Sequence, residues 1–497
     1  MSFAIDPRGG MTADEGDRRA AFRTESHRMP EKNRREGPGL ADWLIVFLLA
    51  GAAIFSFVDR FVLSLLTEPI KHDLGLSDVQ LGLLSGVGFG LFYATLGLPL
   101  GWLADRWSRK GTIVGGIAIW SAATALCGFA ANFTQLMIGR IGVGAGEAAL
   151  VPSSYAIIHD RFSRGRLNLA FAVFQIGGLV GAGLAMLTAG IVYAYFVAGG
   201  GAWIPFVADL RPWQQTFVVA ALPGVLFVIA FLVMKETRRL SGARSDDGVA
   251  IANDPLARIG VYALLFVGMA GLIACSYAMM SWFPAILSRE LHWSPKRIGL
   301  LYGLTLLVVA PAGVLSGGFI ADALHKRGRQ DSHVIVPLAT ACLSIPLFAL
   351  FEFASGGAQL LVSAGCLHYV LGLPLGVAPA LIQRITPVDR RSRTSAVYVL
   401  CCNAFGTGIG PVMIGWLSGL GAGSPHPLRT AVCVTASAAA LMATILLFRL
   451  RSAMLGPDAA SPSQCLPRGD LQPQRRAEPA FRLKAASPAL RVVGKED

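Results

Sequence analysis

Four charged side chains stand inside long apolar runs in the first third of the chain: Asp59, Arg60, Arg140 and Glu147. A charge in such a run is costly to bury, and it marks an ion or substrate pathway when the run crosses a membrane. Arg140 and Glu147 are seven residues apart, about two helical turns, so both can face one interior. Together the four offer two carboxylates and two guanidinium groups to a single buried network.

This network is balanced only while both carboxylates are ionised, because protonating one of them leaves an arginine without its counter-charge. Proton coupling requires that property. We predict that Glu147 is the coupling carboxylate, because it stands among glycines in the middle of its apolar run. Asp59 is predicted to couple with it, while Arg60 and Arg140 supply the opposing charge. The alternative is a purely structural ion network.

A second group of residues is polar or aromatic and could line a cavity between helices. For any one of them, a hydrogen bond between helices or simple core packing is the competing interpretation. The group consists of Gln175, Tyr277, His368, Tyr369 and Asn403.

The sequence indicates no metal or cofactor chemistry. The cysteines and histidines are scattered without metal-ligand spacing. Neither a Gly-x-x-x-x-Gly-Lys-Ser/Thr phosphate loop nor a His-Glu-x-x-His pair occurs. We therefore expect no metal and no cofactor, and we expect neither an enzyme nor a nucleotide-driven pump.

The elements that must position these residues are long apolar helices. The chain of 497 residues is 54% hydrophobic and 15% charged, with a mean hydropathy of +0.57. Its apolar blocks are about twenty residues long, as a helix that crosses a bilayer requires. We predict an all-α membrane protein with twelve transmembrane helices, at residues 42–66, 79–103, 112–131, 135–157, 167–192, 213–234, 257–288, 297–321, 333–354, 359–382, 392–419 and 427–448.

The net charge of +13 is distributed unevenly, because Lys and Arg concentrate in alternate loops between the predicted spans. This is the positive-inside bias, and it predicts that both termini are cytoplasmic. The bias accounts for the basic charge without a nucleic-acid partner. We expect a monomeric, multi-pass protein of the bacterial inner membrane, embedded in the lipid bilayer.

A short motif occurs twice at matching places in the helical pattern. Residues 101–110 read Gly-Trp-Leu-Ala-Asp-Arg-Trp-Ser-Arg-Lys, and Gly-Phe-Ile-Ala-Asp ends at Asp322, 217 residues after Asp105. Duplicated halves around a central site are typical of secondary transporters. We therefore predict two six-helix halves at 41–234 and 257–450, a cytoplasmic linker at 235–256, and disordered cytoplasmic tails at 1–40 and 451–497.

The string at residues 101–110 resembles the signature that follows the second span in the major facilitator superfamily, with Ser108 in place of the usual glycine. The resemblance implies the fold of that family, with two pseudo-symmetric halves of six transmembrane helices. It also implies that the signature controls the conformation of the cytoplasmic side. The residues assigned to this conformational gating are Asp105, Arg106, Arg109, Lys110 and Asp322.

The resemblance further implies where the two aspartates dock. Asp105 would dock on the start of the eleventh span, near residues 392–394, and Asp322 on the start of the fifth span, around Arg166. A carboxylate is disfavoured at the C-terminal end of its own helix and favoured at the N-terminal end of another.

A narrower resemblance, to the spinster-like transporters, covers the first five predicted spans. It rests on Val-Asp-Arg at 58–60, on the motif at 103–110, on Gly-Val-Gly-Ala-Gly-Glu-Ala at 142–148, and on Asp-Arg-Phe at 160–162. That family includes proton-linked carriers of lysolipids and sphingosine phosphate. The resemblance implies that Asp59, Arg60 and Glu147 are coupling residues.

We therefore predict a proton-coupled secondary active transporter that moves a small organic anion or an amphipathic, lipid-like molecule by alternating access. Its partners would be a small-molecule substrate and protons. The Asp-Arg pair at 59–60 also resembles the anion:cation symporter family, so a symporter of that type, or a carrier of sugars or organic acids, is the alternative. A non-transporting membrane receptor or scaffold is the alternative from a different class.

Overall fold

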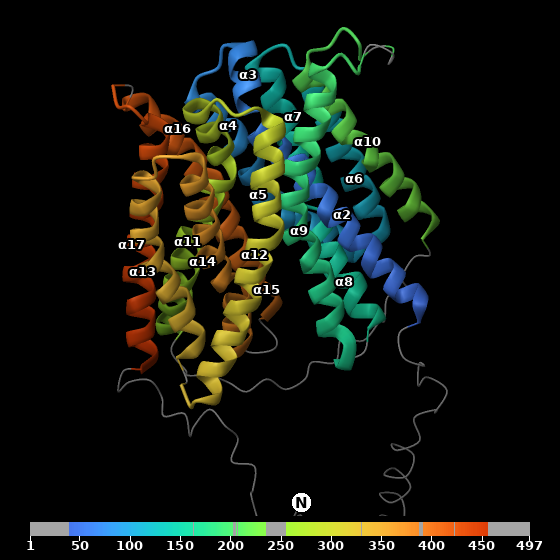
Figure 1. Ribbon diagram of the computed structural model, residues 1–497. Coiled ribbons are helices and arrows are strands. Elements are labelled where there is room, and N and C mark those ends of the chain that lie inside the picture. Colours follow the sequence, from blue (N-terminus) through green and yellow to red (C-terminus); the bar gives the residue numbers. More distant parts are fainter. Residues whose placement is uncertain are drawn as a thin grey trace, which may run out of the picture.

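The computed structural model is a bundle of long helices (Figure 1). It describes residues 39–162, 164–201, 205, 207–234, 255–329, 331–386, 391–421 and 423–455. The tails predicted at 1–40 and 451–497 and the linker predicted at 235–256 lie almost entirely outside these ranges.

Helices account for nearly all of the described chain. Each of the twelve predicted spans overlaps one of the 12 helical segments that are long and apolar enough to cross a membrane. The helices are α2 (Leu40–Leu65), α3 (Thr67–Leu74), α4 (Asp78–Ser85), α5 (Val87–Arg106), α6 (Arg109–Gly128), α7 (Phe133–Glu147), α8 (Leu150–Arg161), α9 (Arg164–Val197), α10 (Pro212–Val233), α11 (Pro255–Leu291), α12 (Pro295–Lys326), α13 (Ser332–Glu352), α14 (Gly357–Ile385), α15 (Arg391–Cys401), η3 (Cys402–Ile409), α16 (Gly410–Leu420) and α17 (Pro427–Leu455).

Three of the spans are interrupted, which the apolar pattern does not show. The second span breaks at Gly86 between α4 and α5, and the fourth breaks after Glu147 between α7 and α8. The eleventh span contains the π-helical segment η3 between α15 and α16. Irregular turns of this kind often accompany functional sites, and two of them adjoin the charged residues described below.

The two sets of helices lie side by side in Figure 1, with α2–α10 in blue to green on the right and α11–α17 in yellow-green to red on the left. Helices α3, α4 and α16 lie together at one end of the bundle, which we call the α4 end. Helix α2 begins, and α8 finishes, toward the opposite end.

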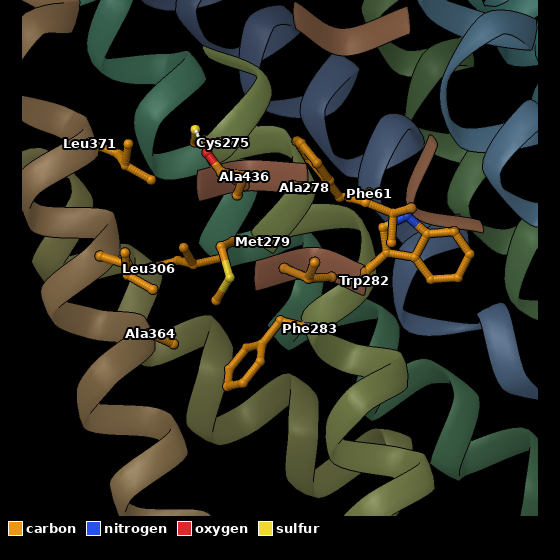
Figure 2. Packing of buried hydrophobic residues seen from close by; sticks show 14 of the residues in the cluster. Phe61, Cys275, Ala278, Met279, Trp282, Phe283, Leu306, Ala364, Leu371 and Ala436 are labelled. Carbon is orange, nitrogen blue, oxygen red and sulfur yellow. Dashed lines mark hydrogen bonds between the residues drawn. The ribbon is translucent and has the colours of Figure 1, made fainter. Parts of the chain in front are cut away.

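Apolar packing crosses between the two sets of helices. Figure 2 shows Phe61 of α2 close to Ala278 and Trp282 of α11. The indole nitrogen of Trp282 donates a hydrogen bond to the carbonyl oxygen of Pro411 in α16, at 3.2 Å. Lipid competes equally for apolar surface, so close packing and such hydrogen bonds hold helices together within a membrane.

Glycines allow the two sets to approach most closely at the α4 end. A Cβ atom on Gly415 of α16 would overlap the carbonyl oxygen of Asp78 in α4, and one on Gly299 of α12 would overlap that of Met186 in α9. Any larger residue at either glycine would force these helices apart. The structure is therefore closed between the two sets at the α4 end.

Candidate functional site

The central feature of the site is a buried ion pair between Arg60 of α2 and Glu147 of α7. The Nη2 atom of Arg60 lies 2.7 Å from Oε2 of Glu147. The hydroxyl of Ser56, one helical turn before Arg60, donates to the same carboxylate oxygen at 2.7 Å. Arg60 and Glu147 are 8% and 1% exposed, so the pair is removed from solvent.

The break in the fourth span explains why Glu147 needs this partner. Glu147 is the last residue of α7, because the helix is interrupted at Ala148 and Ala149. The C-terminal end of a helix carries partial negative charge and disfavours a carboxylate. The guanidinium of Arg60 offsets both that dipole and the cost of burial.

Glycines in α7 bring the neighbouring helices close to this pair. A Cβ atom on Gly144 would lie 2.5 Å from the carbonyl oxygen of Phe89 in α5, and one on Gly146 would lie 2.6 Å from the backbone nitrogen of Trp120 in α6. The glycine-rich string before Glu147 is thus a packing surface between helices.

Aromatic rings surround the guanidinium of Arg60. Its Cζ atom lies 4.3 Å from the ring centroid of Phe89, 4.8 Å from that of Phe57 and 5.0 Å from that of Tyr93. These distances are suited to cation–π attraction, which is strongest when the cation is desolvated. The Nη1 atom donates to the hydroxyl of Tyr277 in α11 at 2.9 Å. Arg60 therefore contacts both sets of helices.

Arg140 of α7 is also buried, with 1% of its surface exposed, but it binds backbone instead of carboxylates. Its Nε atom donates to the carbonyl oxygen of Leu84 at 3.3 Å, and its Nη1 atom donates to the backbone carbonyl oxygen of Asp59 at 3.3 Å. Both hydrogen bonds are long for an N–H donor.

The carboxylate of Asp59 is the unusual group of the site. Asp59 is fully buried, and neither of its side-chain oxygens has a hydrogen-bonding partner among the residues that the structure describes. The predicted four-residue network is therefore only partly connected. Arg60 and Glu147 form an ion pair, whereas Arg140 donates a hydrogen bond to the backbone carbonyl oxygen of Asp59.

Of the five predicted cavity-lining residues, Tyr277 is the one that is hydrogen-bonded to a residue of the buried charged group, Arg60. The hydroxyl of Tyr302 and Nε2 of His368 are hydrogen-bonded within the C-terminal set of helices, at 2.8 Å. The amide of Asn403 donates to the carbonyl oxygen of Val399 in the preceding turn, at 2.8 Å. Gln175 is exposed on α9.

Tyr369 lines a different hollow. It belongs, with Thr305 of α12 and Pro346 of α13, to a groove of about 770 Å³ between α12, α13 and α14. Tyr369 lines this groove, whereas Tyr277 contacts Arg60, so this conformation does not bring the two predicted residues together. The sequence does not fix how α14 is rotated about its axis.

Three of the five predicted gating residues, Arg106, Arg109 and Lys110, have partners within their own set of helices. Arg109 forms an ion pair with Asp160 of α8, and the ammonium group of Lys110 donates to the last carbonyl oxygens of the sixth span, Leu232 and Met234, at 2.7 and 2.6 Å. The guanidinium of Arg106 stacks 4.4 Å from the ring centroid of Trp102.

The two predicted docking contacts stay untested. Asp322 is exposed at the end of α12. The side chains of Asp105 and of residues 391–393 lie outside the described part of the structure, so the predicted contact between them cannot be followed.

A charge cluster at the α4 end, which was not predicted from the sequence, joins the two sets of helices. Arg289 of α11 donates to both carboxylate oxygens of Asp78 at 2.8 and 2.7 Å, and to Glu68 of α3 at 2.7 Å. Asp78 also accepts from Lys71 at 2.5 Å and from the hydroxyl of Ser418 in α16 at 3.0 Å. We call these five residues the α4-end cluster.

A sequence signal for this cluster existed. Glu68, Lys71 and Asp78 follow the first predicted span, and Arg289 follows the seventh, which is the equivalent position in a duplicated chain. Opposite charges in two equivalent loops indicate a contact across the pseudo-symmetry axis.

Comparisons with known proteins place these features in context. A sequence model of the family described as Major Facilitator Superfamily matches residues 48–330 and 265–492. An MFS-type efflux pump of Mycolicibacterium smegmatis is 31% identical over 388 residues, which is 77% of this chain and 86% of that protein. A probable L-galactonate transporter of Escherichia coli is 25% identical over 81% of this chain and 88% of that protein.

The fold also resembles a solved transporter structure. A bacterial homologue of the human lysosomal transporter Spinster, in an inward-facing and unoccupied conformation, superposes with a TM-score of 0.68 at 23% identity. The match covers 84% of this chain and 97% of that one.

Proposed function

Because the chain belongs to the Major Facilitator Superfamily and is a secondary transporter rather than an enzyme, we propose that it couples proton movement to the transport of an organic anion with an apolar part. Transport would proceed by alternating access between the two sets of helices. The observation that carries this proposal is the position of Arg60, which is paired with Glu147 and also faces the second set of helices through Tyr277.

The anionic character of the substrate is inferred from the second contact of Arg60. One of its N–H groups donates to the neutral hydroxyl of Tyr277. A carboxylate or phosphate is a better acceptor for a guanidinium than a phenol is. An anion that reaches this position would displace Tyr277 and would join the two sets of helices through its own contacts.

The apolar part of the substrate is inferred from the rings around this position. Phe57 and Phe61 lie 5.9 Å apart, and Phe61 lies 5.8 Å from Tyr277, measured between ring centroids. An amphipathic anion would place its charge on Arg60 and its apolar part against these rings. A sugar acid is the second candidate, since it also carries a carboxylate, and one relative is named a probable L-galactonate transporter.

Asp59 is the group that we propose carries the proton in this conformation. Neither oxygen of its buried carboxyl meets hydrogen-bond geometry with a described residue, although Thr124 and Arg140 lie near it. A buried carboxylate without a bonded counter-charge is so costly that the neutral acid replaces it. Glu147 instead has Arg60 as its ion-pair partner. We therefore propose Asp59 as the proton carrier in this conformation, whereas the sequence predicts Glu147 as the coupling carboxylate.

Alternating access requires closure at each end in turn. Closure of the α4 end by the α4-end cluster, together with the likeness to an inward-facing structure, supports an orientation with the opposite end toward the cytoplasm. That orientation, an inner-membrane location and cytoplasmic termini are part of the proposal. Asp105 and Asp322 are proposed as the latches that close the cytoplasmic end in the other conformation.

The proposal is tested with purified protein in liposomes that contain a pH-sensitive dye. Lysolipids, sugar acids and simple carboxylates are first screened by thermal shift, because a ligand that binds the native state raises its stability. Each binder is then added to the liposomes. Proton movement that follows binder addition supports the proposal, and substrate movement that is independent of a pH gradient contradicts it.

A further inference from the structure

The second span has a hinge next to the charged site. Helix α4 ends at Ser85 and α5 begins at Val87, and Gly86 between them has φ −96° and ψ −87°, which is not helical. The last carbonyl groups of a helix lack partners within it. Leu84 lies in that last turn of α4, and its carbonyl oxygen accepts the hydrogen bond from Arg140.

Helix α4 is held from its other side by the second set of helices. A Cβ atom on Gly82 would lie 2.5 Å from the carbonyl oxygen of Pro411, and one on Gly86 would overlap that of Gly408. Asp78, the first residue of α4, belongs to the α4-end cluster. A displacement of α4 about the hinge would therefore open both the glycine contact and the cluster.

Arg140 also contacts Asp59, through the backbone carbonyl oxygen of that residue. Neither side-chain oxygen of the same Asp59 meets hydrogen-bond geometry with a described residue, although the hydroxyl of Thr124 lies near it. An ionised carboxylate is a much stronger acceptor for a guanidinium than a backbone carbonyl is. While the Asp59 carboxyl is neutral, Arg140 forms two long hydrogen bonds to backbone carbonyl oxygens.

We propose that Arg140 links the protonation of Asp59 to the position of helix α4. With Asp59 neutral, Arg140 holds the carbonyl of Leu84 and keeps α4 docked on α16. When Asp59 ionises, its carboxylate draws Arg140 away from Leu84, and α4 is free to leave α16 and open the α4 end. The inference rests on the proposed function, because it takes Asp59 as the proton carrier.

The Asp59 carboxylate and the carbonyl oxygen of Leu84 compete for Arg140. The other ionisable groups near Asp59 do not change that competition. Glu147 on α7 already has Arg60 as its counter-charge. Cys127 on α6 is a buried thiol, and the hydroxyl of Thr124 on the same helix is uncharged. Among the described residues that act on the Asp59 carboxyl, Arg140 is thus the cation available to it.

The test measures the distance between spin labels at His72 of α3 and Gly419 of α16, both of which are exposed. Both positions are changed to cysteine in a chain whose exposed Cys342 and Cys366, together with Cys465 outside the described residues, are changed to serine. The protein in nanodiscs should show a short distance at low pH and a growing long-distance population as pH rises. One linked proton changes the ratio of the long-distance to the short-distance population by up to about tenfold per pH unit.

Two variants distinguish the roles. Asp59→Asn should keep the short distance at every pH. Arg140→Lys retains the charge but replaces the separate Nε and Nη1 donors, which reach Leu84 and Asp59, by a single nitrogen on a shorter side chain, so the population should stop responding to pH. Arg297→Lys is the matched control, because Arg297 stacks on Trp293 at a centroid distance of 4.2 Å, outside the cluster, and it should respond like the parent protein.

The outcomes separate this inference from the proposed function. A parental pH response in Arg140→Lys overturns the role of Arg140, even if transport is proton-coupled. If Arg140→Lys does not fold, a parental pH response in Asp59→Asn overturns the link instead. Uphill proton-driven transport by Asp59→Asn, measured in parallel, overturns the assignment of the proton to Asp59. Substrate movement by the parent protein that is independent of a pH gradient overturns the proposed function itself.

Discussion

Arg60 of α2 and Tyr277 of α11 are joined by a hydrogen bond of 2.9 Å that connects the two sets of helices. The same guanidinium is paired with Glu147 at 2.7 Å. One side chain thus connects the buried charge of the first set to the surface of the second. Any ligand that competes for Arg60 changes both the charge balance and the contact between the sets.

The first prediction concerns Tyr277. If a substrate anion displaces its hydroxyl from Arg60, Tyr277→Phe removes a competitor and keeps the ring next to Phe61. A hydrogen bond contributes about 0.5–1.5 kcal/mol, so anion affinity should rise by roughly two- to tenfold. Isothermal titration of a binder from the thermal-shift screen measures this. A loss of affinity would instead show that the hydroxyl contacts the substrate.

The two buried carboxylates should differ in their effect on stability. Glu147→Gln leaves Arg60 without its ion pair, and breaking a buried pair costs about 3–5 kcal/mol. Asp59→Asn removes no ion pair that the described residues form, so its cost should stay below about 1 kcal/mol. The Tm of Glu147→Gln, measured by thermal unfolding in detergent, should therefore be well below the Tm of Asp59→Asn. Equal losses would mean that Asp59 is also paired.

The α4-end cluster should control which end of the bundle is open. Arg289→Gln removes charged hydrogen bonds to Asp78 and Glu68, each worth about 1.5–3 kcal/mol. The closed-to-open ratio should fall by at least roughly tenfold.

A cysteine at Ser64, which is 3% exposed in this conformation, would report that opening by faster reaction with a charged maleimide. Arg211→Gln, which changes an ion pair within the first set of helices, serves as the control. An unchanged labelling rate in Arg289→Gln would show that the cluster does not hold the end closed.

A pH effect on stability is expected at Asp331, which lies just before α13. Burial alone would raise the pKa of Asp331, but hydrogen bonds from Arg329 and Arg451 lower it below its ordinary value. A lowered pKa in the folded state contributes stability above the unfolded pKa of about 4, and this contribution is lost as pH falls through the folded pKa.

Asp331→Asn should therefore lower Tm at neutral pH. The difference from the parent protein should shrink as the pH is brought below about 4. A difference that does not depend on pH would assign the effect to packing at the start of α13 rather than to charge.

Much of the fold could be predicted because apolar length and loop charge are local properties of the sequence. The spans and the buried positions of Asp59, Arg60, Arg140 and Glu147 follow from them. The helix breaks at Gly86 and after Glu147 do not follow from these local properties. Glycine is common throughout these spans, and only the packing decides where a helix is interrupted.

The partners of the charged residues were harder to predict. Two carboxylates and two arginines suggested one network, yet Arg140 binds the carbonyl of Leu84, a backbone group that carries no sequence signal. The pairing of Arg289 with Asp78 depends on how the two sets of helices meet. Rotation of each helix about its axis also decided that Tyr369 faces the groove between α12, α13 and α14.

The measurement that tests the account most directly compares uphill transport with exchange in liposomes for the parent protein and Asp59→Asn. We expect the parent protein to accumulate the substrate anion when a pH gradient is imposed. We expect Asp59→Asn to bind and exchange the substrate but no longer to accumulate it. Accumulation by Asp59→Asn at the parental rate would contradict the assignment of the proton to Asp59.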